Sequence, residues 1–66
     1  MNVRFRVDGV VLHGRVIDSF DNGWVQVEVD RSTPKAEAMA NRALGGAVTR
    51  LLPADAIIEW GAADAG

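Results

Sequence analysis

The sequence has no cysteine and no tyrosine, and it contains a single histidine among its 66 residues. No disulfide can therefore form within the chain, and His13 alone cannot build a zinc site. A chain of this size buries only about 60% of the surface that it exposes when unfolded. We expect one small domain of marginal stability, and because neither a disulfide nor a metal supports it, we expect a homo-oligomer, a dimer or larger.

Long apolar runs are also absent, since no stretch approaches the roughly 18 residues of a membrane span. Residues 1–9 place arginines inside an alternating pattern, unlike an export signal. The formal net charge is −2, and the six arginines are scattered among acids, which disfavours nucleic-acid binding. A chain without cysteine suits a reducing compartment, and the cytoplasm is the expected location. No membrane partner, metal or cofactor is predicted.

Alternating apolar and polar residues, the pattern of half-buried strands, run through most of the chain. Five short strands are predicted, at residues 2–8, 10–20, 24–30, 48–52 and 56–60. Gly14, in the middle of the second segment, indicates a bulge or a bend. The expected fold class is mainly β, with residues 1–60 forming one domain and residues 61–66 forming a flexible tail.

Residues 32–47 differ from the rest because their apolar positions recur at helical spacing. A capping serine or threonine, Pro34 in the first turn and a pair of glycines at the end predict one inserted helix at about residues 34–44. Only Met39 and Leu44 are large on its apolar face. The helix can cover one end of the sheet, or it can contact a second subunit.

Two segments, "GVVLHGRVIDSFDNGWVQVEVD" (residues 9–30) and "GAVTRLLPADAIIEW" (residues 46–60), resemble the SH3-like barrels. The resemblance implies a five-stranded small barrel. It also places Trp24 and Pro53 at the tryptophan and proline that line the peptide groove of SH3 domains. The tyrosine that follows that proline is replaced by Ala56, so the resemblance does not extend to the whole groove.

A more distant likeness is to the type II plasmid dihydrofolate reductases, which are short SH3-like chains that form a tetramer around a central pore. Aligned on the proline, their Val-Gln-Ile-Tyr-Pro stretch matches residues 49–53 here. Their functional glutamine and tyrosine are replaced by Arg50 and Leu52. The resemblance therefore supports an oligomeric small barrel and does not support the reductase activity.

Trp24 falls in phase with the polar residues of its strand, such as Gln26, and out of phase with the valines. If the first three strands are neighbours, three arginines share this outer face. An aromatic ring beside guanidinium groups can bind an anionic aromatic ligand or the carboxylates of a partner. Alternatively, the arginines are solvated and paired with acids such as Glu28. We assign five residues to the candidate binding surface: Trp24, Gln26, Arg4, Arg6 and Arg15.

The turn at residues 21–23 can close in two ways, which give Trp24 different surroundings. A two-residue loop pairs Phe20 with Val25 and leaves Trp24 at the solvent edge. A three-residue loop with Gly23 in the left-handed region places Phe20 directly opposite Trp24. We favour the three-residue loop, which would create an aromatic patch on the polar face.

The three-residue loop has one misfit when it is continued along the hairpin. It pairs Ile17 with Val27, and it then sets Arg15 against Val29 on the core face. A bulge at Gly14 would move Arg15 to the other face, and we expect the bulge there.

Trp60 ends the last strand, in which neither face is wholly polar. We therefore assign Trp60, together with Met39 and Leu44, to a subunit interface. The leading functional hypothesis is a non-enzymatic binding or assembly module that contacts itself and possibly another protein.

Two alternatives remain at this stage. One is a small-molecule site or enzyme at a subunit junction, where symmetry gathers His13 or Arg50 from several chains; the other is a nucleic-acid-associated barrel. No serine or threonine has the sequence context of an activated nucleophile, so an enzyme is the less favoured reading.

Overall fold

The computed structural model describes residues 1–62, with five strands, one α-helix and one 3-10 helix. The elements in chain order are β1 (Asn2–Val7), β2 (Val10–Ser19), β3 (Trp24–Val29), α1 (Pro34–Leu44), β4 (Thr49–Pro53), the 3-10 helix η1 (Ala54–Ala56) and β5 (Ile57–Trp60). The predicted fold class, mainly β with one inserted helix, is confirmed. The helix has the predicted bounds.

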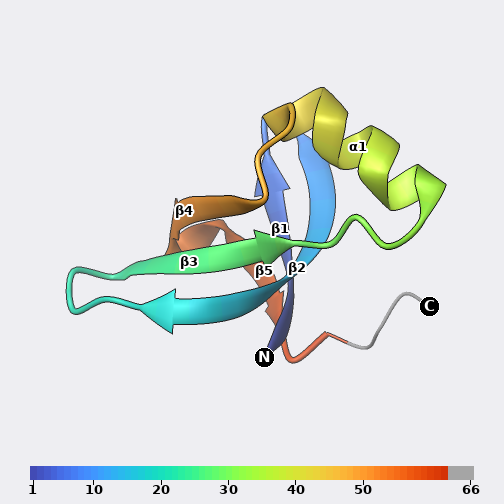
Figure 1. The fold of residues 1–66 in the computed structure, drawn as a ribbon. Coiled ribbons are helices and arrows are strands. Elements are labelled where there is room, and N and C mark those ends of the chain that lie inside the picture. Colours follow the sequence, from blue (N-terminus) through green and yellow to red (C-terminus); the bar gives the residue numbers. More distant parts are fainter. Residues whose placement is uncertain (63–66) are drawn as a thin grey trace.

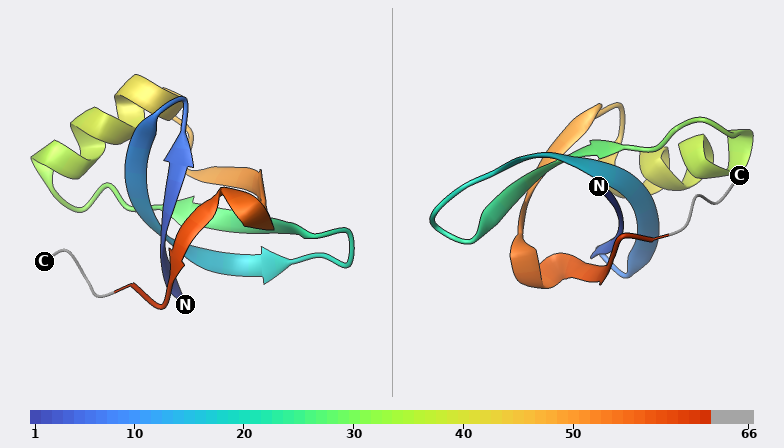
Figure 2. Two further views of the ribbon diagram at one scale, coloured as in Figure 1. Left: turned by 180° about the vertical axis from the view of Figure 1, so that it is seen from behind. Right: turned by 90° about the horizontal axis from the view of Figure 1, so that it is seen from below.

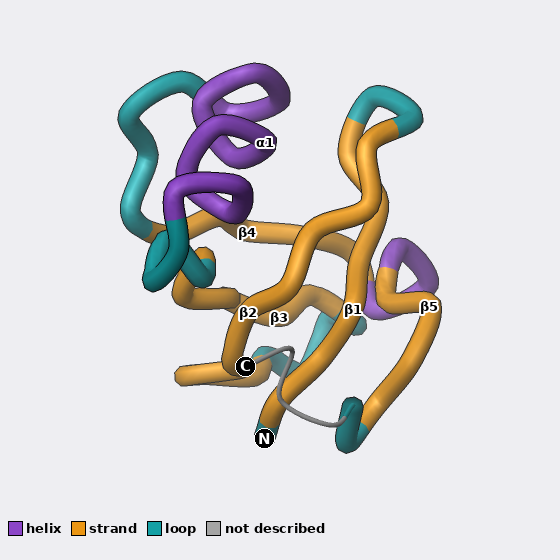
Figure 3. Tube along the Cα trace, turned by 90° about the vertical axis from the view of Figure 1, so that its right-hand side faces the viewer, coloured by secondary structure: helices purple, strands orange, loops and turns teal. Residues whose placement is uncertain are grey.

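All neighbouring strands are antiparallel, and their order across the sheet is β4-β3-β2-β1-β5. The long strand β2 bends, so the sheet curls around one face while β4 and β5 remain its two edges (Figures 1 and 2). α1 lies at one end of this curled sheet, the same end as the turn between β1 and β2 (Figure 3). The result is an open, barrel-like sheet with a helix at one end.

The core lies on the inner face of the curled sheet. Every second residue of β1 and β3 is buried there: Val3, Phe5, Val7, Val25, Val27 and Val29. Phe5 is the largest fully buried side chain, and its burial stabilises the fold by roughly 1.5–3 kcal/mol. The remaining members of the same cluster are Leu12, Ala40, Leu52 and Ile57. The alternation of apolar and polar residues therefore predicted the buried residues of β1 and β3 correctly.

The turn between β2 and β3 has the three-residue form. The Phe20 backbone N–H donates to the Trp24 carbonyl oxygen at 2.9 Å, so these two residues face each other across the hairpin. Gly23 has a φ of 83°, in the left-handed region that glycine enters at little cost. The Asn22 Oδ1 atom accepts a hydrogen bond from the Trp24 backbone N–H at 3.1 Å and holds the turn. The favoured register is confirmed at the turn.

The bulge, however, is not at Gly14. The register shifts between Val16 and Asp18, so Ile17 is the extra residue and the predicted Ile17–Val27 pair does not form. Beyond the bulge Arg15 lies opposite Glu28, on the outer face. The register shift that moves Arg15 to the outer face is therefore present, but the extra residue is Ile17, three residues closer to the turn than Gly14.

Gly14 has a different role, which is to let two strands approach closely. It is buried, and a Cβ at this position would lie 2.5 Å from the Glu28 carbonyl oxygen and 2.6 Å from Cγ1 of Val27. The first of these atoms is backbone and cannot rotate away. The sequence signal at Gly14 was real, but its cause is lack of space and not an extra residue.

The connections at both ends of α1 are held by side chains of the segment that follows β3. Thr33 caps the helix, since its Oγ1 accepts a hydrogen bond from the Ala36 backbone N–H at 3.0 Å. At the other end the Arg31 guanidinium donates to the Gly45 and Ala47 carbonyl oxygens and to the Asn41 side chain. One arginine therefore ties the start of the connection to the end of the helix.

Asp30 begins the same connection, and its carboxylate makes the stability of the fold depend on pH. Its Oδ1 accepts a hydrogen bond from the Ser32 backbone N–H at 2.9 Å, and Ser32 lowers the pKa of the carboxyl below its ordinary value, with a smaller contribution from His13. A lowered folded-state pKa gives stability above the unfolded value of about 3.9, which is lost as the pH falls through the folded value.

We expect Asp30→Ala to reduce the free energy of unfolding by about 1 kcal/mol at pH 7 and by much less near pH 2. Urea denaturation of both proteins at the two pH values measures the difference. Asp55→Ala is the control, because no hydrogen bond within residues 1–62 uses the Asp55 carboxylate. An equal loss for Asp30→Ala at both pH values would contradict the assignment.

Residues 61–66 were predicted to be a flexible tail. The structure describes the first two of them. Ala62 is buried, and its backbone N–H donates to the Asn2 carbonyl oxygen at 3.0 Å. The described structure therefore continues past Trp60 to Ala62, and residues 63–66 lie outside the described residues.

Candidate functional site

A row of exposed apolar side chains crosses the outer face of β2, β3 and β4 near the hairpin turn. Phe20 faces Trp24 across the hairpin, and Trp24 faces Pro53 in the β3–β4 register. Leu51, on the same face as Pro53, is opposite Gln26. The exposed fractions are 43% for Phe20, 39% for Trp24 and 51% for Leu51. We call Phe20, Trp24, Leu51 and Pro53 the hairpin strip.

Local structure explains why these four side chains are together. Trp24 starts β3 in phase with its outward polar residues, and the three-residue turn brings Phe20 opposite it. β4 then adds alongside β3, and the Ala54 backbone N–H donates to the Gly23 carbonyl oxygen at 2.8 Å, which anchors η1 beside the turn. Ile17, the extra residue of the bulge, is also exposed, at 45%. A contiguous apolar surface of this kind is a common mark of an interaction site.

Three carboxylates surround the hairpin strip, and none has a cationic partner within residues 1–62. Asp18 lies opposite Gln26 in the adjacent row of the same face. Asp21 is in the turn, and Asp55 is in η1, two residues after Pro53. The strip therefore combines an aromatic and aliphatic surface with unbalanced negative charge.

The predicted arginines share the outer face but not the position of Trp24. Trp24 and Glu28 are four residues apart on β3, about 13 Å along a strand. Arg15 lies opposite Glu28, whereas Arg4 and Arg6 lie on β1, opposite the half of β2 that precedes Arg15. The predicted surface is therefore divided: Trp24 belongs to the hairpin strip, and Arg4 and Arg6 lie towards the helix end of the sheet.

Two of these arginines are engaged within the chain. Arg15 Nη2 donates to Glu28 Oε1 at 3.2 Å. Arg4 Nε is 3.3 Å from Glu59 Oε1, an ion pair whose angles fall short of a hydrogen bond. Both pairs follow the alternative interpretation, in which strand arginines pair with neighbouring acids. Arg6 is exposed and has no partner among the described residues.

Gln26, between Trp24 and Glu28 on β3, contributes to the cohesion of the sheet. Its Nε2 donates to Thr49 Oγ1 on β4 at 3.3 Å. The side chain is only partly exposed, so it forms the polar boundary of the hairpin strip on the side away from the turn.

The three residues assigned to a subunit interface have different surroundings. Met39 and Leu44 are partly buried against the core of the same chain, so the helix covers one end of the sheet. Trp60 is 48% exposed on the edge strand β5, opposite Val3. Of the three, Trp60 is the one with a large surface left for a second chain.

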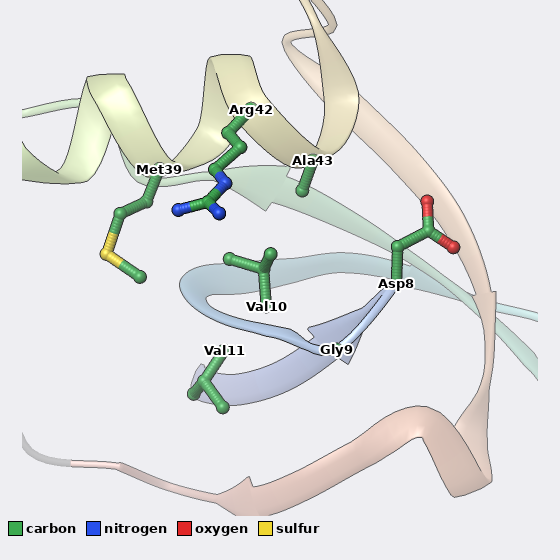
Figure 4. A pocket seen from close by; sticks show the side chains of 7 residues that line it. All are labelled: Asp8, Gly9, Val10, Val11, Met39, Arg42 and Ala43. Carbon is green, nitrogen blue, oxygen red and sulfur yellow. The ribbon is translucent and has the colours of Figure 1, made fainter.

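A groove of about 520 Å³ lies between α1 and the β1–β2 turn. We call it the helix groove, and Figure 4 shows its seven lining residues: Asp8, Gly9, Val10, Val11, Met39, Arg42 and Ala43. Asp8 and Gly9 have φ values of 50° and 78°, which define the tight two-residue turn that forms this edge of the groove.

The described residues contain no arrangement typical of a catalytic or metal site. No group of three or more histidine, aspartate or glutamate side chains within residues 1–62 could hold a metal ion. The His13 imidazole has no hydrogen-bond partner in that range, and Thr49 accepts a bond from Gln26 and is not activated. Arg50 is exposed on β4, opposite Val27. Neither His13 nor Arg50 is part of a cluster within a single chain.

Sequence reasoning missed Leu51 as a member of the site and Arg31 as a structural anchor. Leu51 lies in a strand whose apolar residues are adjacent, so periodicity could not assign it to a face. Its position depends on the pairing of β3 with β4 across the inserted helix. For Arg31 no local pattern exists, because its partners lie 10 to 16 residues further along the chain.

The sequence matches no protein-family model, and no curated protein or solved structure shows a significant match to it. Within the described part of the chain, neither helix has both the length and the apolar character needed to cross a bilayer.

Proposed function

We propose that this protein is a non-enzymatic binding or assembly module that contacts other protein chains through the hairpin strip. The observation that carries the proposal is the group of exposed large apolar side chains on one face, with Phe20 and Trp24 side by side. Aromatic anchors with an exposed apolar surround are typical of the energetic centres of protein interfaces.

The unpaired carboxylates indicate the charge expected on the surface of the partner. Asp18, Asp21 and Asp55 surround the hairpin strip without a cation within residues 1–62, so a partner that brings cations would pair with them. The partner surface is therefore apolar at its centre and basic at its margin. A nucleic acid does not fit this description, because phosphates would face the same carboxylates.

The resemblance to SH3-like barrels remains part of the proposal. It is supported by the position of Trp24 directly opposite Pro53, the two residues that the resemblance places in a shared groove. The module we propose does not need the missing tyrosine, because Phe20 and Leu51 supply the neighbouring apolar surface.

A direct test uses two synthetic extended peptides, one alternating leucine with lysine and the other alternating leucine with glutamate. We expect only the lysine peptide to shift backbone amide NMR signals, and we expect the shifts at residues 17–26 and 51–55. Trp24→Ser should weaken this binding by about thirtyfold or more, the effect of losing an interface anchor.

The matched control is Val48→Ser, which removes an apolar side chain that is 65% exposed but lies outside the hairpin strip. Binding by this variant should equal that of the unmodified protein. Equal binding of both peptides, or shifts that cluster elsewhere on the sheet, would show that the strip is not the contact surface.

A further inference from the structure

The helix groove has an apolar floor beneath a cation that no described residue neutralises. Val10 and Met39 face the groove from β2 and α1, and the Arg42 guanidinium extends over them (Figure 4). Arg42 forms no hydrogen bond or ion pair within residues 1–62. The Asp8 carboxylate lies at the rim and points away from Arg42 (Figure 4). The groove therefore presents a free positive charge.

Two more unpaired cations belong to the elements that form the groove. Arg6 is exposed and pairs with Val11 in the β1–β2 ladder, so its side chain lies on the outer face, opposite to the face that Val10 turns to the core. Lys35 lies one helical turn before Met39, on the same side of α1. Neither has an acidic partner among the described residues. The lining carries one acid, Asp8, and one cation, Arg42, and Lys35 adds a second cation on the same side of the helix.

The hairpin strip is the complement of the helix groove in both shape and charge. The strip projects two aromatic rings with three unpaired carboxylates around them. The groove offers an apolar recess with unpaired cations around it, and its volume lies within the roughly 300–1,000 Å³ of protein binding pockets. The β2–β3 hairpin extends away from α1, so the two surfaces are at opposite ends of the molecule (Figure 1).

We propose that the hairpin strip of one copy docks into the helix groove of a second copy, in a head-to-tail arrangement. This inference rests on the proposed function and names the partner as the chain itself. Trp24 or Phe20 enters the groove between Met39 and the β1–β2 turn, and Arg42 meets the carboxylates that surround the strip. Contacts of this type repeat, because each copy keeps one free strip and one free groove.

A symmetric contact between the hairpin strips of two copies would not bring a cation to the carboxylates. It would bring Asp18, Asp21 and Asp55 of one copy against the same residues of the other, and like charges across an interface are unfavourable. The head-to-tail contact instead pairs unbalanced acids with unbalanced cations, which is why it is preferred.

The experiment uses two variants, each of which blocks one end of the molecule. Trp24→Ser removes the aromatic anchor of the strip, and Arg42→Glu reverses the charge at the groove. Sedimentation velocity at low ionic strength should show concentration-dependent assembly of the unmodified protein. Each variant alone should be monomeric, with association weakened at least tenfold.

An equimolar mixture of the two variants should form a one-to-one dimer and nothing larger. The Arg42→Glu copy keeps an intact strip and the Trp24→Ser copy keeps an intact groove, so one productive contact remains and further growth is blocked. Added salt should weaken this dimer, because the pairing charges are exposed. Arg50→Glu, which makes the same charge change on β4, is the control and should assemble as the unmodified protein does.

Three results would overturn the inference: an unmodified protein that is monomeric at every concentration, a mixture of variants that stays monomeric, or an Arg42→Glu variant that still dimerises through two strips. Circular dichroism melting curves of each variant confirm that it is folded. If the protein stays monomeric while the lysine peptide still binds the strip, the proposed function stands and the self-association does not.

Discussion

Gly14→Ala is expected to lower the free energy of unfolding by about 3 kcal/mol, the upper end of the usual cost of overpacking a core. The new methyl group would stand 2.5 Å from the Glu28 carbonyl oxygen. That oxygen belongs to the backbone of the paired strand, so relief requires β2 and β3 to separate. A domain of this size has only about 3–10 kcal/mol of stability in total, and a large fraction of the protein should unfold on mild heating.

The measurement is thermal and urea denaturation followed by circular dichroism. Gly46→Ala is the matched control, because an added Cβ there meets no atom within 4 Å. Its stability should be unchanged or slightly higher, since alanine restricts the unfolded chain. If Gly14→Ala were as stable as Gly46→Ala, the result would contradict the close approach of β2 and β3 at Gly14.

Arg31→Met is expected to lower the free energy of unfolding by about 2 kcal/mol, in the range of hydrogen bonds made by a charged group. The guanidinium donates hydrogen bonds to the carbonyl oxygens of Gly45 and Ala47 and to the side-chain amide oxygen of Asn41. The Ala47 oxygen lies 2.7 Å from Nη2 and 3.2 Å from Nε. Its loss leaves the carbonyl oxygens at the end of α1 without their partner. The connection to β4 should then loosen.

Arg31→Lys should recover little of the lost stability, because one ammonium cannot reproduce the planar fork of donors. Arg42→Met, near the same end of the helix, is the control and should change the stability by less than about 0.5 kcal/mol. Hydrogen exchange should also accelerate at residues 44–49 in Arg31→Met alone. Full recovery by lysine would mean that charge, and not the fork, holds the connection.

Much of the fold could be predicted from the sequence because its signals are local. Alternation in β1 and β3 identified the buried valines and Phe5, and capping chemistry around Pro34 defined the bounds of the helix. The tolerance of Gly23 for positive φ predicted a tight turn at residues 21–23. Each of these signals depends on residues within a few positions of one another.

The candidate site was predicted only in part, because it joins segments that are distant in the chain. Trp24 and its aromatic neighbour Phe20 follow from the turn alone. Leu51 joins them only through the pairing of β3 with β4, which closes around an inserted helix. The separation of Trp24 from Arg4 and Arg6 likewise depends on which residues of β2 pair with β1 and which pair with β3.

The sequence by itself determined which residues form strands, which form the helix and which face of β1 and β3 is apolar, since backbone preference and burial act over short distances. Only the tertiary structure decided where the bulge in β2 falls, why Gly14 must be glycine and which exposed residues meet. Those features depend on the space between paired strands and on contacts across 10 or more residues. No local pattern in a chain encodes that space.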